Sequence, residues 1–179
     1  MHRKSANLKT RVGLLRPSHV QPIADAFEAF GLNKPVSQYQ RYLAEQEQAR
    51  RTVLVAFGTD DRFCGYVTIN WRPDYPPFRA EDIPEIQDFN VLPHVRRRGI
   101  GTHLMNEAER MVRERSPVAG IGVGMDADYG AAQRLYVLRG YIPDGKGLTY
   151  KNRFVRYGER VTIDDELVLY FTKHLATCS

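Results

Sequence analysis

The middle of the chain holds a strand, a helix and a second strand in succession, and this order constrains the fold more than any other feature of the sequence. Residues 86–92 (IQDFNVL) predict a strand, and residues 99–115 predict a helix whose apolar stripe includes Ile100 and Leu104. Residues 118–125 (VAGIGVGM) predict a buried second strand. Two strands joined by a crossover helix lie parallel in the same sheet. The sequence therefore predicts an α/β protein with a parallel pair at its centre.

The segments on either side add antiparallel strands and further helices. Residues 52–57 and 63–71 flank Gly58-Thr59-Asp60-Asp61, which has the composition of a turn, so they predict a hairpin. Residues 72–84 contain four prolines and predict a loop. The other predicted elements are a strand at 11–16, helices that begin at Ser18, Ser37 and Tyr129, and a last strand at 167–171. The simplest fold with these elements is mixed α+β, with one mixed sheet and helices on both faces.

Composition restricts the class of protein further. Of the 179 residues, 42% are hydrophobic and 26% are charged, which is typical of one soluble globular domain. The aromatic content excludes a disordered chain, and no apolar run approaches the roughly 18 residues of a membrane-spanning helix. We expect a single domain over residues 10–179. It follows an extension at 1–9 that lacks the apolar stretch of a secretory signal and whose order the sequence leaves open.

The two cysteines give information about the cellular compartment. Cys64 lies in an apolar run and Cys178 is next to the last residue, so we expect no disulfide between them. No spacing typical of a zinc site is present, and we expect no metal. These features favour a reduced, cytoplasmic setting.

The most informative segment is a basic turn at residues 91–102 (VLPHVRRRGIGT), between the predicted strand and the predicted helix. The first amides of a helix have no partner inside the helix and carry partial positive charge. Glycines at 99 and 101 would let a phosphate approach the backbone, and three arginines at 96–98 add charged donors. The turn therefore predicts a site for a diphosphate, with an ordinary solvated turn as the alternative. The dinucleotide pattern would need a glycine where Leu104 stands, and no Gly-Lys-Ser/Thr run is present.

Two motifs in this order resemble those of the GNAT superfamily of N-acetyltransferases. Arg96-x-x-Gly99-x-Gly101 matches the family's signature for the diphosphate of acetyl-CoA. Downstream, Ala132-x-x-Leu135-Tyr136-x-x-x-Gly140-Tyr141 resembles a family helix, and the resemblance covers about residues 11–172. It implies a GNAT-like central mixed sheet of six to seven strands that is splayed at its parallel pair. It also implies transfer of an acetyl group from acetyl-CoA to an amine.

The resemblance assigns roles to particular residues. It makes Tyr136 the general acid that protonates the leaving thiolate, and Glu85 a candidate general base; Asp88 and a water chain remain alternatives for the base. It also implies that the coenzyme bonds to one of two splayed strands. The residues expected to bind the coenzyme are Asn90, Val91, Arg96, Arg97, Arg98, Gly99, Ile100, Gly101 and Thr102.

Three details qualify these assignments. Strand alternation predicts Glu85, Gln87 and Phe89 on one face of the strand, and Asp88 and Asn90 on the other. Glycines 120, 122 and 124 share a face of the next strand, which leaves space for a ligand or for close packing. The family often has an asparagine that contacts the coenzyme where this chain has Tyr129, so the resemblance does not assign that contact here.

The acceptor is not determined by the sequence. A primary amine of a small molecule or of a protein is expected, and acidic residues at 81, 82, 85 and 88 would favour a cationic one. A homodimer is left open and no membrane partner is expected. The formal net charge of +5 raises the alternative of a nucleic-acid-binding module, which the absence of recognised motifs disfavours. A coenzyme-binding protein of this fold without transferase activity is the other alternative.

Overall fold

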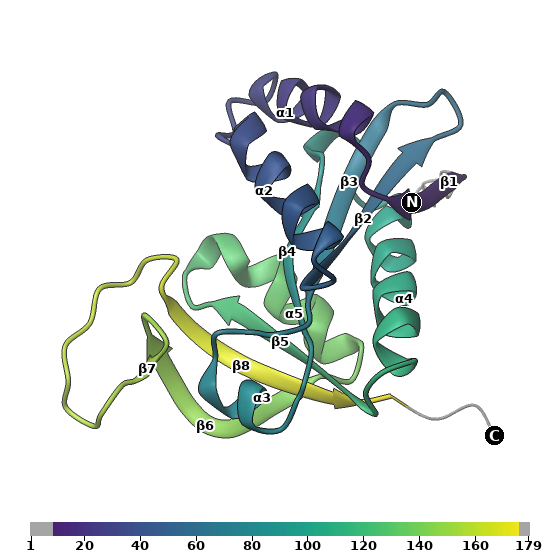
Figure 1. The fold of residues 1–179 in the computed structure, drawn as a ribbon. Helices are drawn as coiled ribbons and strands as arrows, with labels where there is room; N and C mark the ends of the chain where they lie inside the picture. The colour runs from purple at the N-terminus through teal and green to yellow at the C-terminus, as the bar shows by residue number, and fades with distance from the viewer. Residues whose placement is uncertain (1–8, 176–179) are drawn as a thin grey trace, which may run out of the picture. The chain divides into compact units, whose positions relative to one another are not determined.

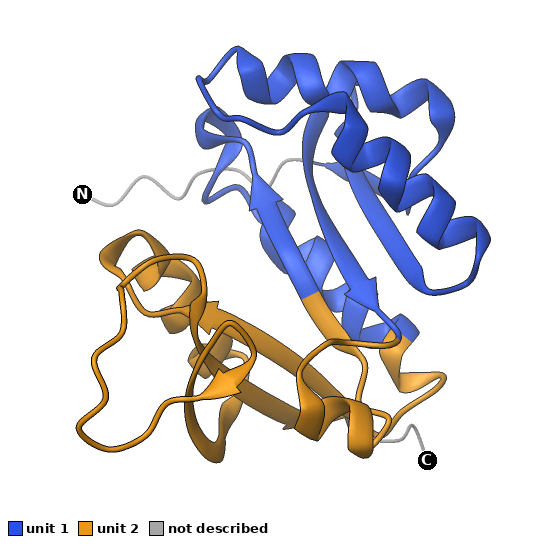
Figure 2. Ribbon diagram, turned by 60° about the vertical axis from the view of Figure 1, so that its left-hand side comes forward, with its two compact units in different colours: residues 1–71, 87–111 blue, residues 72–86, 112–179 orange. Residues whose placement is uncertain are grey.

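The computed structural model describes residues 9–175, and the contacts divide the chain into two compact units. Unit 1 contains residues up to 71 together with 87–111, and unit 2 contains residues 72–86 and those from 112 onward (Figure 2). Residues 1–8 of the expected extension and Cys178 lie outside the described part of the chain. Eight strands are hydrogen-bonded in the order β1-β2-β3-β4-β5-β8-β6-β7, one more than the upper end of the expected range.

Unit 1 is built on an antiparallel hairpin. The expected first strand and hairpin form as β1 (Thr10–Leu14), β2 (Arg51–Gly58) and β3 (Phe63–Asn70), with antiparallel registers between β1 and β2 and between β2 and β3. Helices α1 (Val20–Glu28) and α2 (Val36–Glu47) lie together beside these strands (Figure 1). Their apolar side chains pack onto the sheet, because Phe27 and Tyr39 each make an edge-on contact with the ring of Tyr66.

The central strand–helix–strand unit also forms as expected. Strand β4 (Glu85–Val91) leads through the short helix η2 (Pro93–Val95) into α4 (Ile100–Arg113), and β5 (Val118–Gly124) follows. Strands β4 and β5 are parallel, with Glu85 opposite Gly120 and Ile86 opposite Ile121. In the described residues this register covers only these two pairs, although each strand has seven residues. The predicted parallel pair is therefore confirmed.

Unit 2 contains the remaining strands. Strand β8 (Leu167–His174) is antiparallel to both β5 and β6 (Ile142–Tyr150), and the two-residue strand β7 (Arg153–Phe154) pairs with β6. Helix α5 (Gly130–Leu138) follows the short helix η3 (Ala127–Tyr129) and ends before Gly140. Strand β6 begins two residues after this glycine.

The proline-rich segment differs from the prediction of a plain loop. It contains helix α3 (Pro76–Ala80), whose two prolines occupy the first turn. Proline is tolerated there because the first amides of a helix have no intrahelical acceptor. Its residue Phe78 joins Tyr75, Ile83 and Tyr170 in a buried cluster in which the rings of Tyr75 and Tyr170 stack at 3.6 Å. The segment is therefore part of the core of unit 2.

Candidate functional site

The basic turn contains two residues with positive φ, a backbone conformation that favours glycine. Arg97 has φ +61° and Gly99 has φ +85°, so the chain passes twice through the left-handed region before α4 begins. The first backbone hydrogen bond of α4 runs from the His103 amide to the Gly99 carbonyl at 3.0 Å. The amides of Ile100, Gly101 and Thr102 precede it and have no acceptor within the helix. They are the donors that an anion at this helix end would use.

The three arginines of the turn do not have equivalent roles. The Nε atom of Arg96 donates to the Val91 carbonyl at 2.9 Å, which closes the turn onto the end of β4. Arg97 is exposed, and Arg98 is partly buried. Arg96 thus stabilises the turn, a role that the sequence did not predict. Its terminal nitrogens are further hydrogen-bond donors.

A basic pocket lies beside the start of α4 in unit 1. Its volume is about 610 Å³, and Lys9, Thr10, Arg98, Gly99, Thr102, His103 and Asn106 line it. The Thr10 hydroxyl and the Nδ1 atom of His103 are 2.8 Å apart, which fixes the imidazole at the pocket wall. Two cationic side chains, an imidazole and the helix end make the pocket suitable for an anionic group. Lys9, Thr10 and His103 carry no motif, so the sequence offered no signal that would have found them.

The fold requires glycine at position 101 for a reason other than the predicted approach of a phosphate. A Cβ atom at this position would lie 2.9 Å from the ring of Phe89, so a side chain here would displace that ring. Close packing against β4 therefore requires glycine at position 101 whether or not a phosphate approaches. The requirement at Gly99 is its positive φ, which a side chain would strain.

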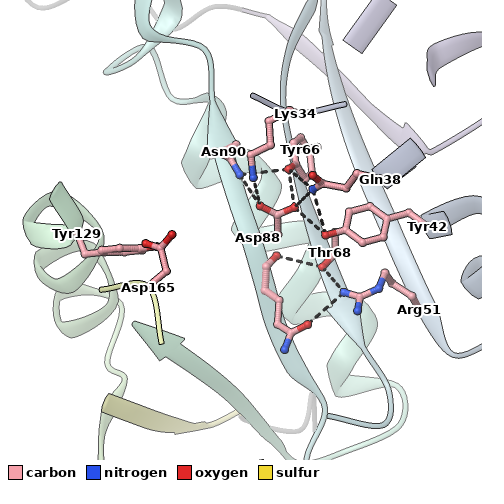
Figure 3. A network of polar contacts seen from close by, with 11 residues as sticks. Lys34, Gln38, Tyr42, Arg51, Tyr66, Thr68, Asp88, Asn90, Tyr129 and Asp165 are labelled. Atoms are coloured by element: carbon pink, nitrogen blue, oxygen red, sulfur yellow. Dashed lines mark hydrogen bonds and ion pairs between the residues drawn. The ribbon is translucent and has the colours of Figure 1, made fainter. Parts of the chain in front are cut away.

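The second feature of unit 1 is a cluster around Asp88 (Figure 3). Oδ1 accepts from Lys34 Nζ and from Asn90 Nδ2, both at 2.8 Å. Oδ2 accepts from Gln38 Nε2 and the Tyr42 hydroxyl at 2.8 Å and from the Tyr66 hydroxyl at 2.5 Å. None of the four partners beyond Asn90 was predicted, because they come from α2, β3 and the connection between α1 and α2.

The donors around Asp88 determine its ionisation. Burial raises the pKa of the carboxyl, but the charge of Lys34 and the hydrogen bonds from Lys34, Tyr66 and Tyr42 outweigh it and hold the pKa below its ordinary value. Burial and the same carboxylate raise the pKa of Tyr42 to about 12. A carboxylate with a low pKa and all its lone pairs occupied is a poor proton acceptor. Asp88 is therefore a weak candidate for a general base.

The predicted alternation along β4 is wrong at Gln87, whereas Asn90 shares the side of Asp88 as predicted, since its Nδ2 atom donates to Asp88 Oδ1. Arg51 Nη1 donates to Gln87 Oε1 at 3.1 Å, and the Arg51 guanidinium lies 4.8 Å from the centre of the Tyr42 ring. Since the Tyr42 hydroxyl donates to Asp88, the consecutive side chains of Gln87 and Asp88 both contact groups on the side of α2. Phe89 then faces Gly101 of α4. The physical reason is a positive φ of +44° at Asp88, which inserts a bulge into the strand.

The other predicted site residues belong to unit 2. Glu85 is buried at the start of β4, and its Oε1 atom would lie 3.3 Å from a Cβ atom placed on Gly122. Tyr136 is buried on α5, and burial, followed by the nearby Tyr129, raises the pKa of its hydroxyl. The structure thus groups Asn90, Val91 and the basic turn in unit 1, and Glu85 and Tyr136 in unit 2.

The glycine face of β5 is filled by aromatic rings rather than open. A Cβ atom on Gly120 would lie 2.2 Å from Phe78, and one on Gly124 would lie 2.5 Å from Tyr129. The Tyr129 hydroxyl also donates to Asp165 Oδ1 at 2.9 Å (Figure 3). Of the two explanations left open for these glycines, close packing applies within unit 2.

The predicted acidic patch does not form as one surface. Glu81 and Asp82 are exposed, whereas Glu85 is buried and Asp88 is enclosed by its donors in unit 1. Within residues 9–175, no group of three or more His, Cys, Asp or Glu side chains has the arrangement of a metal site. No helix of that range has the length and apolar character needed to cross a membrane.

Comparison with known proteins identifies the class. The model of the acetyltransferase (GNAT) family matches residues 21–141, which contain both motifs singled out in the sequence. The chain belongs to the GNAT acetyltransferase family, and the resemblance inferred from its motifs is confirmed. No curated protein matches the chain.

Solved structures show the same fold at low identity. A GNAT-family acetyltransferase structure from Desulfovibrio desulfuricans is 17% identical, with a TM-score of 0.69, and the match covers 94% of this chain and all of that one. An acetyltransferase from Salmonella typhimurium, solved with its cofactor acetyl-CoA, is 15% identical, with a TM-score of 0.64 and coverage of 95% and 96%. A spermidine/spermine N-acetyltransferase from Vibrio cholerae is 13% identical, with a TM-score of 0.64 and coverage of 93% and 92%.

Proposed function

We propose that the protein is an N-acetyltransferase that moves the acetyl group of acetyl-CoA to a primary amine. The observation that carries the proposal is the start of α4, where a glycine with φ +85° precedes amides that have no acceptor within the helix, next to a pocket lined by Lys9 and Arg98. The diphosphate and the further phosphate of the coenzyme are anions that suit these donors. The GNAT structure with acetyl-CoA from Salmonella typhimurium supports the same coenzyme.

The reaction needs two proton movements. The amine nitrogen attacks the thioester carbonyl carbon, the C–S bond breaks, and the thiolate takes up a proton while the new amide nitrogen loses one. Tyr136 is proposed to give the proton to sulfur. Burial raises the pKa of this hydroxyl, which keeps it in the protonated form that a donor requires but makes the transfer more uphill.

Glu85 is proposed to take the proton from the amine. The alternative carboxylate, Asp88, is held ionised and fully hydrogen-bonded, which makes it the weaker base. A Glu85→Gln variant should lose the acidic limb of the pH profile of kcat/KM. A profile that does not change would assign the proton to a water chain instead.

The proposal includes the setting and extent of the enzyme. Both units are taken as parts of one catalytic domain over residues 10–179. Cys64 is buried with its thiol free, which agrees with a reduced, cytoplasmic compartment. Cationic amines are included among the acceptors to be tested, because a relative of this fold is named a spermidine/spermine acetyltransferase.

The first experiment separates the three candidate functions. Acetyl-CoA binding is measured by isothermal titration, and free-thiol release is then measured over a panel of primary amines. An N-acetyltransferase binds the coenzyme and releases thiol only when an amine is present. Binding without amine-dependent release would indicate a coenzyme-binding protein. No coenzyme binding, together with salt-sensitive binding to DNA, would indicate the nucleic-acid module.

A matched pair of glycine variants tests the site itself. Gly99→Ala places a side chain at φ +85° at the start of α4, and we expect it to weaken acetyl-CoA binding by about tenfold. Gly158→Ala imposes the same kind of strain at φ +78° in the segment between β7 and β8, where nothing lies within 4 Å of the new Cβ atom. Equal effects of the two substitutions on binding would refute the assignment of the basic turn.

A further inference from the structure

The cluster around Asp88 has no part in the proton transfers proposed above, yet it surrounds a strand residue whose backbone is in the left-handed region. Of the non-glycine residues with positive φ in the described part of the chain, Asp88 is the one that lies inside a strand. Its carboxylate accepts five hydrogen bonds, from Lys34, Gln38, Tyr42, Tyr66 and Asn90. A carboxylate has about four lone-pair positions, so its acceptor capacity is fully used.

The left-handed residue interrupts the alternation of side chains between Gln87 and Asp88. In a regular strand, successive side chains point to opposite faces. Here Gln87 contacts Arg51 and Asp88 contacts Tyr42, both on the side of α2, while Phe89 faces Gly101. Without the bulge, Phe89 would point toward α2, and the ring that packs under the first turn of α4 would be missing.

The cluster also joins three elements at this one point. Lys34 comes from the connection between α1 and α2, Tyr42 and Gln38 come from α2, and Tyr66 comes from β3. The ammonium of Lys34 and the carboxylate are only partly exposed, at 26% and 18% of their side-chain surfaces. A charged pair that is shielded from water and surrounded by neutral donors holds its geometry better than a surface pair does.

We propose that Asp88 is a positioning residue: its hydrogen-bonded carboxylate holds the left-handed turn that presents residues 89–91 to the coenzyme and places Phe89 beneath the basic turn. The inference rests on the proposed function, because Asn90 and Val91 are assigned there to coenzyme binding. It assigns to Asp88 an effect on coenzyme affinity and none on the chemical step. The required property is the backbone conformation at position 88, which a residue without a carboxylate can also adopt if it tolerates positive φ.

Two substitutions at the same position separate the backbone from the carboxylate. Asp88→Ala removes the acceptor and disfavours φ +44°, whereas Asp88→Gly removes the acceptor but adopts this φ freely. We expect Asp88→Ala to raise the KM for acetyl-CoA at least tenfold with little change in kcat. Asp88→Gly should return the KM to within about threefold of the wild-type value. Both constants are expressed per folded enzyme, with the folded fraction taken from near-UV circular dichroism.

Asp61 provides the matched control. It is an exposed aspartate at φ +56° in the turn between β2 and β3. Asp61→Ala and Asp61→Gly impose the same backbone changes there, and neither should alter the KM for acetyl-CoA.

A smaller perturbation covers the case in which Asp88→Ala does not fold. Tyr66→Phe removes one donor to Oδ2 and should raise the KM about threefold in the wild-type enzyme, but not further in the Asp88→Gly background. Such a cycle shows that Tyr66 acts through Asp88.

The outcomes distinguish this inference from the proposed function. Equal losses in the Ala and Gly variants would overturn it, because they would assign the effect to the carboxylate rather than the turn. An unchanged KM in Asp88→Ala, or additive effects in the cycle, would also overturn it. If the wild-type protein fails to bind acetyl-CoA, the proposed function itself fails, and that result is obtained before any variant is made.

Discussion

Tyr136 lies buried on α5, beside the ring of Tyr141 at 6.1 Å between centroids. Burial raises the pKa of its hydroxyl above the ordinary value, so the group is protonated throughout the usual assay range. Its ability to act as an acid then depends on charge that develops on sulfur during C–S cleavage. A substitution can therefore separate the packing of its ring from the proposed donation of its proton.

Replacing Tyr136 by Phe keeps the ring and removes the proton. We expect kcat to fall by roughly a hundredfold, which is the lower end of the usual range for general acid catalysis. The KM for acetyl-CoA and the midpoint of urea denaturation should stay close to the wild-type values. An unchanged kcat in steady-state assays would remove Tyr136 from the mechanism.

Asp88 makes the stability of the protein depend on pH in a defined direction. Its folded-state pKa lies below the unfolded value of about 3.9, so its contribution to stability is present above that pH and is lost as the pH falls through the folded pKa. The difference in the free energy of unfolding between wild type and Asp88→Asn should be constant from pH 7 to about pH 5 and shrink below pH 4. Urea denaturation at each pH measures it. A difference that grows on acidification would contradict the lowered pKa.

At the scale of elements, the glycines of β5 show how packing decides between two interpretations of the same sequence pattern, a ligand site and close packing. Three glycines on one face of a strand are compatible with a ligand or with close-packed groups. The rings of Phe78 from α3 and Tyr129 from η3 occupy this face within unit 2. The short helix α3 lies in the segment that was predicted to be a loop, and it supplies the ring that makes glycine necessary at position 120.

Gly120→Ala tests this packing. The added Cβ atom would lie 2.2 Å from Phe78, so the ring or the strand must move, and we expect a loss of about 1–3 kcal/mol in the free energy of unfolding. Gly130→Ala is the matched control, since Gly130 is helical at φ −53° with nothing within 4 Å. There, alanine should stabilise the protein by about 0.5 kcal/mol. Equal denaturation midpoints for the two variants would contradict the packing argument.

At the scale of the whole molecule, an excess of positive charge is combined with a basic pocket at the start of α4. The net charge of +5 alone favours any polyanion. The basic pocket at the start of α4 is more selective, because it combines charged side chains with directed backbone amides. The stability of the folded chain should therefore respond to a ligand that carries the diphosphate and not to one that lacks it.

Acetyl-CoA at a hundred times its dissociation constant should raise the free energy of unfolding by about 2.7 kcal/mol, because it binds the folded chain alone. S-acetylpantetheine carries the same thioester but no phosphate, and at the same concentration it should produce no measurable change. Thermal or urea denaturation with each ligand makes the comparison. Equal stabilisation by both would show that the basic turn does not hold the diphosphate.

The sequence by itself determined the elements and the family. Periodic apolar residues, turn residues and the Arg96-x-x-Gly99-x-Gly101 motif are local patterns, so the central strand–helix–strand unit, the hairpin, the basic turn and the GNAT family were all predicted correctly. Local patterns succeed here because hydrogen bonding within a helix and alternation along a strand depend on residues close in sequence.

Tertiary structure alone decided the contacts between residues far apart in the chain. The positive φ of Asp88 interrupts the expected alternation at Gln87, and the Asp88 carboxylate accepts from donors as far as 54 residues away. Two other contacts also join residues that are distant in the sequence. Thr10 pairs with His103 across 93 residues, and aromatic rings from other elements fill the glycine face of β5. Such contacts are set by how the elements pack, since the free energy of burying and pairing these groups outweighs the local preference of any single residue.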